Sequence, residues 1–223
     1  MNTDDLPNVS FDENSSPGST ELHFLSSSTY NVLLRPLMDR LELKDPSAIR
    51  TLRSGMLQAE HEQEGFLYNF IRHLVAKAEL HISLQESFLH MHGRASSDEL
   101  RLLNGGAVVQ EVGQRAAILR SILARIPDEI GDRRTFLETI KEIANSIKKL
   151  LDAINSLIPL LSPDLQPVID QRKREFVKYS KRFSNTLKEY FKGESCETVF
   201  HSANHLICQI MIFIRVIREK IIL

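Results

Sequence analysis

The fold is decided by residues 136–157, which read FLETIKEIANSIKKLLDAINSL. The apolar side chains of this segment recur at alternating spacings of four and three residues, at Phe136, Ile140, Ile143, Ile147, Leu150, Ile154 and Leu157. This repeat places all of them on one face of an α-helix and is typical of a helix in an antiparallel bundle. The segment therefore predicts a long helix with one buried face.

Three further helices are expected around this segment. One covers residues 107–123, and another begins near Ile169 and ends at Gly193. The last begins near Glu197 and is apolar almost all round. No segment alternates with a period of two residues over the length of a strand. The fold class is therefore predicted to be all-α, with a four-helix up-down bundle over residues 107–223.

The N-terminal half carries weaker signals. Residues 29–77 contain three short apolar stripes at helical spacing, which bury too little surface to be stable alone, so a second chain is expected to cover them. Residues 78–106 predict a linker with at most one helix. Residues 1–28 contain five acidic residues and no Lys or Arg, and they predict a disordered acidic tail.

Composition excludes several classes of protein. The net charge of the 223 residues is -1, and the two cysteines, Cys196 and Cys208, are too few for a disulfide framework or a four-ligand zinc site. They are expected to be reduced thiols in a cytosolic protein. The N-terminus has no pattern of a secretory leader. Charged residues interrupt the apolar stretch 206–223, which predicts a buried or partner-facing helix rather than a membrane span.

Motifs for catalysis are absent from the sequence. It contains no phosphate-binding glycine loop, no nucleophile elbow and no zinc-protease motif. His201 and His205 share one helical face, but two ligands do not make a metal site. Asp128, Glu129 and Asp132 are explained by the preference of acids for helix N-termini. The chain is therefore predicted to have no enzymatic activity, no metal and no cofactor.

Two triplets of residues suggest a binding surface instead. Lys141, Ala144 and Lys148 have the same order and spacing as a second set on the next helix. That set consists of Lys181, Ser184 and Lys188. If the two helices are neighbours, the small residues form the floor of a shallow groove and the four lysines form its rims. Such a groove suits an amphipathic helix that carries leucines and acids. The alternative is that both triplets are ordinary solvated lysine faces.

The region around the second triplet is strongly basic. Residues 166–192 contain eight basic and three acidic residues. The aromatic residues of this helix fall on its core stripe, so stacking of nucleic-acid bases is not indicated. Binding to an anionic membrane surface stays open, because polybasic helices attract anionic lipids.

Several segments of the chain resemble the programmed cell death protein 10 family, also called the cerebral cavernous malformation 3 family. The clearest are RIPDEIGDR at 125–133, FLETIKEIA at 136–144 and EFVKYSK at 175–181. The similarity covers roughly residues 29–218 and is most specific between 125 and 192. The resemblance does not extend to residues 1–28.

The resemblance implies a non-catalytic adaptor. In that family, the N-terminal helical domain pairs with itself, or with the C-terminal tail of germinal-centre subfamily III (Ste20-type) kinases, which it stabilises and localises. The C-terminal bundle is similar to a focal adhesion targeting domain. It docks paxillin-type leucine/aspartate-rich motifs, striatin and the second cavernous malformation adaptor. A rival function is a peripheral membrane module that binds phosphoinositides; no nucleic-acid partner is expected.

The resemblance also implies positions and a location. The family's dimer and kinase contacts fall on Leu52, Gly55, Leu74 and Val75, with glycine at 55 where the family has alanine. Its motif-binding positions fall on the six residues of the two triplets. The expected location is cytoplasmic, with peripheral association at the Golgi and plasma membrane. The expected processes are regulation of apoptosis, cell junctions, tubulogenesis and the striatin-interacting phosphatase and kinase complex.

Overall fold

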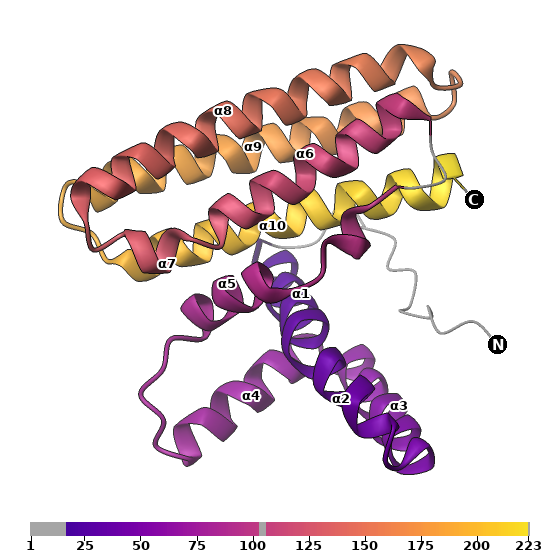
Figure 1. The fold of residues 1–223 in the computed structure, drawn as a ribbon. Coiled ribbons are helices and arrows are strands. Elements are labelled where there is room, and N and C mark those ends of the chain that lie inside the picture. The colour runs from indigo at the N-terminus through magenta and orange to yellow at the C-terminus, as the bar shows by residue number, and fades with distance from the viewer. Residues whose placement is uncertain (1–16, 103–105, 223) are drawn as a thin grey trace. The chain divides into compact units, whose positions relative to one another are not determined.

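Helices account for every regular element in the part of the chain that this computed structural model describes, residues 17–102 and 106–222 (Figure 1). Among these residues there is no strand, so the all-α prediction is confirmed. The chain divides into two compact units, Met1–Ile82 and Ser83–Leu223, here called unit 1 and unit 2.

From residue 17 onward, where the structure describes it, unit 1 contains four α-helices and one π-helical turn. In chain order they are α1 Pro17–Ser28, the π-helical turn Thr29–Leu34, α2 Arg35–Glu42, α3 Pro46–Glu62 and α4 Phe66–Lys77. The π-helical turn lies just before Pro36, whose ring nitrogen cannot donate a backbone hydrogen bond. It joins α1 to α2 without a loop.

Unit 2 is built around four long helices. Its α-helices are α5 Leu84–Arg94, α6 Ala107–Leu123, α7 Ile126–Glu129, α8 Arg133–Leu157, α9 Gln166–Tyr190 and α10 Cys196–Ile217. Short 3-10 turns cover Ser97–Leu100 and Ile158–Leu160, and a π-helical turn covers Arg218–Ile222. The predicted four long helices of the C-terminal half are therefore present.

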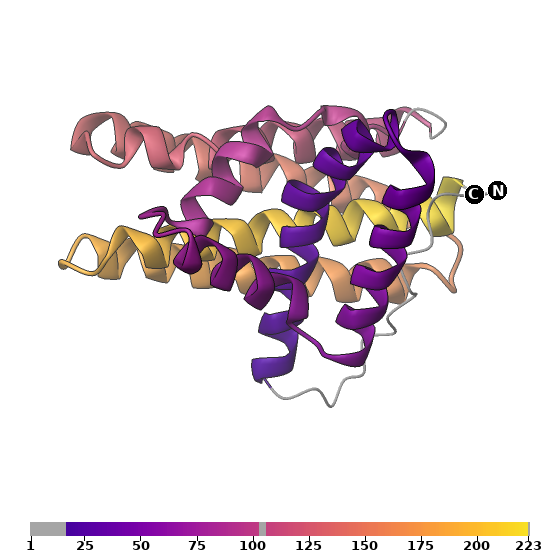
Figure 2. The same cartoon turned by 90° about the horizontal axis from the view of Figure 1, so that it is seen from below.

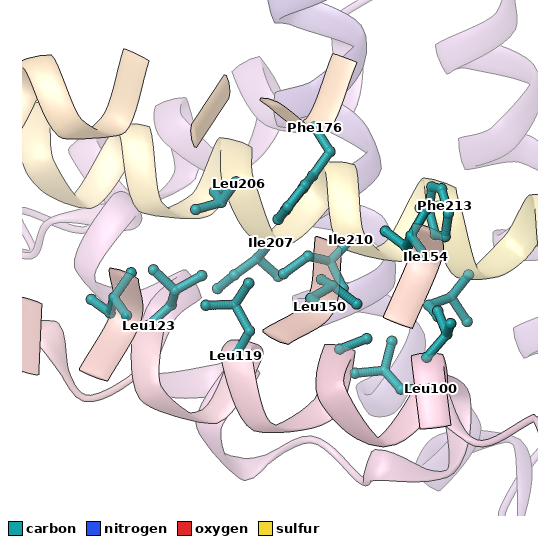
Figure 3. Packing of buried hydrophobic residues seen from close by; sticks show 14 of the residues in the cluster. Leu100, Leu119, Leu123, Leu150, Ile154, Phe176, Leu206, Ile207, Ile210 and Phe213 are labelled. Carbon is teal, nitrogen blue, oxygen red and sulfur yellow. The ribbon is translucent and has the colours of Figure 1, made fainter. Parts of the chain in front are cut away.

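The core of unit 2 lies between α6, α8, α9 and α10 (Figure 3). Helix α8 packs mainly against α6, and α9 mainly against α10. Five of the seven residues predicted for the seam of α8 are buried, whereas Ile140 and Ile147 are half-buried. Thr139 and Ser146 complete the buried face, so the seam tolerates hydroxyl groups. One hydroxyl, that of Thr139, donates a hydrogen bond to the backbone oxygen of Thr135.

Helix α8 begins later than the acids at 128 and 129 suggest. Those acids belong to the one-turn helix α7, and Asp132 is the N-cap of α8. The Asp132 carboxylate accepts hydrogen bonds from the backbone nitrogens of Arg134 and Thr135 at 2.9 and 3.4 Å. These bonds satisfy donors that have no partner inside the helix.

The predicted linker over 78–106 differs from the structure, because α5 is an integral part of unit 2. Phe88 and Leu89 of α5 are buried, and the helix packs against α6, α7 and α10. The Asn204 side-chain nitrogen of α10 donates to the backbone oxygen of Gln85 at 2.8 Å and to its side-chain oxygen at 3.0 Å. The sequence signal was weak because Gln85 and His92 interrupt the buried face with polar groups.

The predicted tail over 1–28 is corrected in its second half. Residues 17–28 form α1, in which Phe24, Leu25 and Ser26 are buried. The Ser26 hydroxyl accepts a hydrogen bond from the backbone nitrogen of Tyr68 at 3.5 Å. Serines therefore pack against α4 in a segment that composition alone describes as polar. The rest of this prediction, residues 1–16, lies outside the described residues.

Two buried histidines of unit 2 make its stability depend on pH. Burial, together with the nearby Arg120, lowers the pKa of His92 to about 3. Burial, together with His201 and Arg182, lowers the pKa of His205 to about 3. Both side chains are therefore neutral in the folded protein at pH 7, and both take up protons near pH 6.5 when the chain unfolds.

We expect the free energy of unfolding to be greatest above pH 6.5 and to fall as the pH decreases toward 5. The slope should approach about 1.4 kcal/mol per pH unit for each histidine. Urea denaturation followed by far-UV circular dichroism at pH 7.5, 6.5 and 5.5 measures it. The variants His92→Gln and His205→Gln should each reduce the slope, and His81→Gln, at an exposed position, should not. An equal slope in all four proteins would contradict the assignment.

Candidate partner-binding surfaces

Unit 1 exposes apolar residues on two helices, α3 and α4, here called its two arms. Figures 1 and 2 show α3 and α4 diverging from the turn that joins them. Leu52 and Gly55 lie on α3, where Leu52 is 46% exposed. Leu74 and Val75 lie on α4, where Leu74 is 54% exposed and Val75 is half-buried. The four predicted interface residues are therefore accessible or half-accessible, but they form two separate apolar patches within one chain.

The turn between the arms is shaped by Gly65 and Glu60. Gly65 has a φ of 88°, a left-handed conformation that glycine adopts most readily. The Glu60 carboxylate accepts hydrogen bonds from the backbone nitrogens of Gly65 and Leu67 at 2.9 and 2.8 Å. It thereby caps the N-terminus of α4 from the last turn of α3. These contacts set the direction in which α4 leaves α3.

Helix α3 buries none of its own residues. It begins at Pro46, after the N-cap Asp45, whose carboxylate accepts a hydrogen bond from the backbone nitrogen of Ala48 at 3.0 Å. A methyl group built on Gly55 would meet no atom of the described residues within 4 Å. No contact within that part of the chain therefore requires a glycine at position 55.

The two basic triplets of unit 2 lie on neighbouring helices, α8 and α9. The Phe136 ring contacts the rings of Tyr190 and Phe191, with centroids 5.7 and 6.0 Å apart. These contacts define the antiparallel register of the two helices. Ala144 lies about 12 Å along α8 from Phe136, and Ser184 lies about 10.5 Å along α9 from Phe191. The small residues of the two triplets are therefore level with each other, and all six residues are exposed.

The floor between the triplets is apolar. Ile140, Ile147 and Leu151 are half-buried and lie on the same side of α8 as Ala144, four residues before it and three and seven residues after it. On α9, the Ser184 hydroxyl donates to the backbone oxygen of Ser180 at 3.0 Å. Its hydrogen-bonding capacity is thus partly used within the helix. We call the surface formed by the two triplets and this floor the α8–α9 groove.

Two residues of the groove were missed by the sequence analysis. Leu137 and Phe191 are large exposed apolar residues at the end where α8 begins and α9 ends. The signal for Leu137 was its position four residues before Lys141, on the same helical stripe. Phe191 lies inside the helix predicted to end at Gly193, seven residues after Ser184, so its signal was the same helical stripe.

The outer face of α9 carries most of the basic side chains of that helix. It borders a shallow depression of about 910 Å³, whose basic lining residues are Lys173, Arg174, Lys178, Lys181 and Arg182. Glu189 and Glu194 also line it. This surface, here called the basic α9 face, shares Lys181 with the groove.

The histidines and cysteines form no metal-binding cluster in the described part of the chain, where no group of three or more His, Cys, Asp or Glu residues is placed to hold an ion. The rings of His201 and His205 lie 4.5 Å apart, and Tyr179 lies 5.5 Å from His205. Burial raises the pKa of the Cys208 thiol to about 12, which disfavours the reactive thiolate.

The stretch Cys196–Ile221 is long and apolar enough to cross a membrane by length and composition. In unit 2 it packs against α5, α6 and α9, and residues such as Phe200, Ile207 and Ile210 are buried there. This packing is that of a core helix.

Comparison with known proteins groups the chain into the same two parts. Residues 23–81 match the sequence profile described as programmed cell death protein 10, dimerisation domain. Residues 82–174 match the profile described as programmed cell death protein 10, C-terminal. A protein named programmed cell death protein 10 homolog, from Caenorhabditis elegans, is 42% identical over 207 residues. That alignment covers 89% of this chain and 96% of the relative.

The open space at Gly55 leads to a prediction. Replacing Gly55 with alanine should raise the free energy of unfolding of dilute protein by about 0.5–1 kcal/mol, because alanine loses less backbone entropy in a helix. Gly113→Ala is the matched control, since its added methyl would collide with the backbone oxygen of Leu100 and should destabilise unit 2. Urea denaturation measures both. A loss of stability in Gly55→Ala would show that this face is already covered.

Proposed function

This chain belongs to the programmed cell death protein 10 family, and on that basis we propose that it is a non-catalytic adaptor with one partner-binding surface in each unit. Unit 1 carries the family's dimerisation domain. The proposal assigns kinase pairing to unit 1 and the docking of helical motifs to unit 2. Its alternative is a membrane-binding module, considered below.

One observation carries the proposal for unit 1: α3 is a 17-residue helix with no buried residue. Isolated helices of this length are marginal in water and are usually stabilised by packing of an apolar face. Leu52 on α3 and Leu74 on α4 would both leave water if a second chain lay against the two arms. Burial of such side chains contributes about 1.5–3 kcal/mol each. A partner chain is therefore the natural source of the missing stabilisation.

We propose that this partner is the C-terminal tail of a germinal-centre subfamily III kinase, and a second copy of this chain when no kinase is present. Leu52, Gly55, Leu74 and Val75 would contact it. Both partners would have to offer an apolar helical surface, because the arms themselves expose leucines. The adaptor would thereby stabilise the kinase and determine its location.

For unit 2, we propose that the α8–α9 groove binds leucine/aspartate-rich helices of the paxillin type. Leucines at helical spacing would lie on the apolar floor beside Ala144 and Ser184, and acids would face the four lysines. The same unit would connect the kinase to striatin and to the second cavernous malformation adaptor.

The proposed location follows from these partners. The adaptor would be cytoplasmic and would reach the Golgi and plasma membrane through the proteins that it binds. Its processes would be those of the family: regulation of apoptosis, cell junctions, tubulogenesis and assembly of the striatin-interacting phosphatase and kinase complex.

The basic α9 face supports the second candidate, a peripheral module that binds phosphoinositides. Five basic side chains beside two acids attract anionic headgroups, and this attraction weakens as salt is added. Sedimentation with phosphoinositide vesicles, with and without a kinase-tail peptide, separates the two functions. Vesicle binding without any peptide binding would favour the membrane module over the adaptor.

The unit 1 surface is tested by the double variant Leu52→Asp, Val75→Asp. It should abolish self-association and kinase-tail binding, because each change places a charge in an apolar contact, which costs several kcal/mol. Calorimetry measures the binding. The melting of unit 2 should be unchanged, since neither residue belongs to its core. Undiminished kinase-tail binding by the folded variant would place the interface elsewhere.

The α8–α9 groove is tested by Lys148→Glu with Lys181→Glu. This variant should bind an acidic leucine-rich helical peptide about tenfold or more weakly, since exposed ion pairs contribute about 0.2–1 kcal/mol each and reversal adds repulsion. Ala144→Asp should weaken binding further by placing a charge on the apolar floor. Lys178→Glu is the control, exposed on the same helix but outside the triplet. An equal loss in the control would leave only a diffuse basic surface.

A further inference from the structure

The half-buried side of helix α3 combines apolar and charged residues. Its inward stripe runs Ile49, Arg53, Met56 and Glu60 at spacings of four, three and four residues, and all four are half-buried. Leu52 borders this stripe, three residues after Ile49, and is 46% exposed; with Gly55 it forms what is here called the apolar side of α3. In an ordinary amphipathic helix the inward stripe is apolar throughout. The attachment of α3 to unit 1 therefore includes charged contacts as well as apolar ones.

The principal contact is made by Arg53. Its Nη2 donates to the Asp39 carboxylate at 2.8 Å and to the Glu42 carboxylate at 3.0 Å. Both acceptors lie on α2, three residues apart, so one guanidinium joins two successive positions of the neighbouring helix. The Arg53 side chain is 21% exposed, and its buried Nε has no hydrogen-bond partner among the residues that the structure describes.

The surroundings of Arg53 separate it from an ordinary surface ion pair. Tyr30, from the π-helical turn, is buried nearby, and burial raises the pKa of its hydroxyl. Burial opposes the charge of Arg53, but hydrogen bonding to Asp39 and the nearby carboxylates outweigh it and raise the pKa of Arg53. Exposed pairs contribute little because water screens them, whereas partly buried pairs that lose one partner leave a charge without compensation.

Glu60 makes the second polar attachment, seven residues further along the same stripe. Its carboxylate accepts from the first backbone nitrogens of α4. Arg53 therefore attaches α3 to α2, and Glu60 attaches it to α4. Between these two points lies Gly55, on the side that meets no atom of the described residues. The orientation of the apolar side of α3 is thus set in part by these two charged residues.

We propose that Arg53, through Asp39 and Glu42, is the positioning residue that orients the apolar side of α3 for a second copy of this chain. The inference rests on the proposed function of unit 1. A partner chain that covers Leu52 and Gly55 would also exclude water from Arg53 and strengthen its attraction to both carboxylates. The ion pairs and the apolar contact would therefore reinforce each other.

A dependence on salt distinguishes this role from simple stabilisation. A purely apolar association is not weakened by added sodium chloride, whereas one that depends on the Arg53 ion pairs is weakened. Self-association of the full-length chain, measured by analytical ultracentrifugation between 0.05 and about 0.5 M salt, should therefore weaken as salt is added. In Arg53→Gln, association should be about tenfold weaker at low salt and should no longer respond to salt.

Exchanging the charges of Arg53 and its two acidic partners is the decisive experiment. Arg53→Glu alone should weaken association by more than about tenfold, and adding Asp39→Lys and Glu42→Lys should recover most of it. Arg50→Gln is the matched control, because the Arg50 guanidinium on the same helix donates to the backbone oxygen of Pro46, at 3.0 Å, and forms no ion pair with a described residue. An equal loss in Arg50→Gln, or no recovery in the triple variant, would overturn the proposal.

Two further measurements separate the possible failures. If Leu52→Asp leaves self-association unchanged, the proposed surface of unit 1 is wrong. If Leu52→Asp abolishes self-association but the Arg53 variants associate normally, only the positioning role of Arg53 is wrong. Hydrogen exchange on the full-length chain reports on α3 whether or not it associates. Arg53→Gln should accelerate exchange of α3 amides about tenfold relative to those of α8. Unchanged α3 exchange would overturn the proposal.

Discussion

The burial of α10 is the constraint on which the rest of unit 2 depends. This helix is apolar on nearly every side, and a helix of that kind has to be covered all round. Helix α9 covers one side, α6 another and α5 a third. The bundle is thus completed by a fifth helix, attached through the hydrogen bonds between Asn204 and Gln85. Once α10 is enclosed, the outer sides of α8 and α9 are free to carry charge.

Unit 1 differs from unit 2 in how much of its apolar surface is covered. It is small, and several of its leucines, including Leu37, Leu52 and Leu74, stay exposed because the unit has too few elements to cover them. Its internal order comes from a small apolar core that includes Leu34, Leu67 and Ile71, together with caps and ion pairs at Asp45, Arg53 and Glu60. Polar contacts are directional, so they can hold two arms apart, whereas apolar contacts alone would draw the arms together. An adaptor needs such an arrangement, since its apolar surface must remain available to a second chain.

The two units therefore offer chemically different surfaces. Unit 1 presents leucines on divergent arms, which suit an extensive apolar partner. Unit 2 presents a narrow apolar floor between lysines, which suits a short acidic helix. Leu52 belongs to one unit and Lys148 to the other, so the two surfaces lie on separate parts of the chain.

The sequence alone determined the four long helices of unit 2, the absence of alternating strand patterns and the helical phase of Lys141, Ala144 and Lys148. These features depend on periodicity within one segment, where neighbouring residues define the geometry. Tertiary structure decided which helices are neighbours, the register that sets Ala144 level with Ser184, and the docking of α5 on α10. It also decided that Arg53 faces Asp39 and Glu42 rather than solvent. These outcomes depend on contacts between residues far apart along the chain, and no local pattern encodes which distant side chain will complete a hydrogen bond or cover an apolar face.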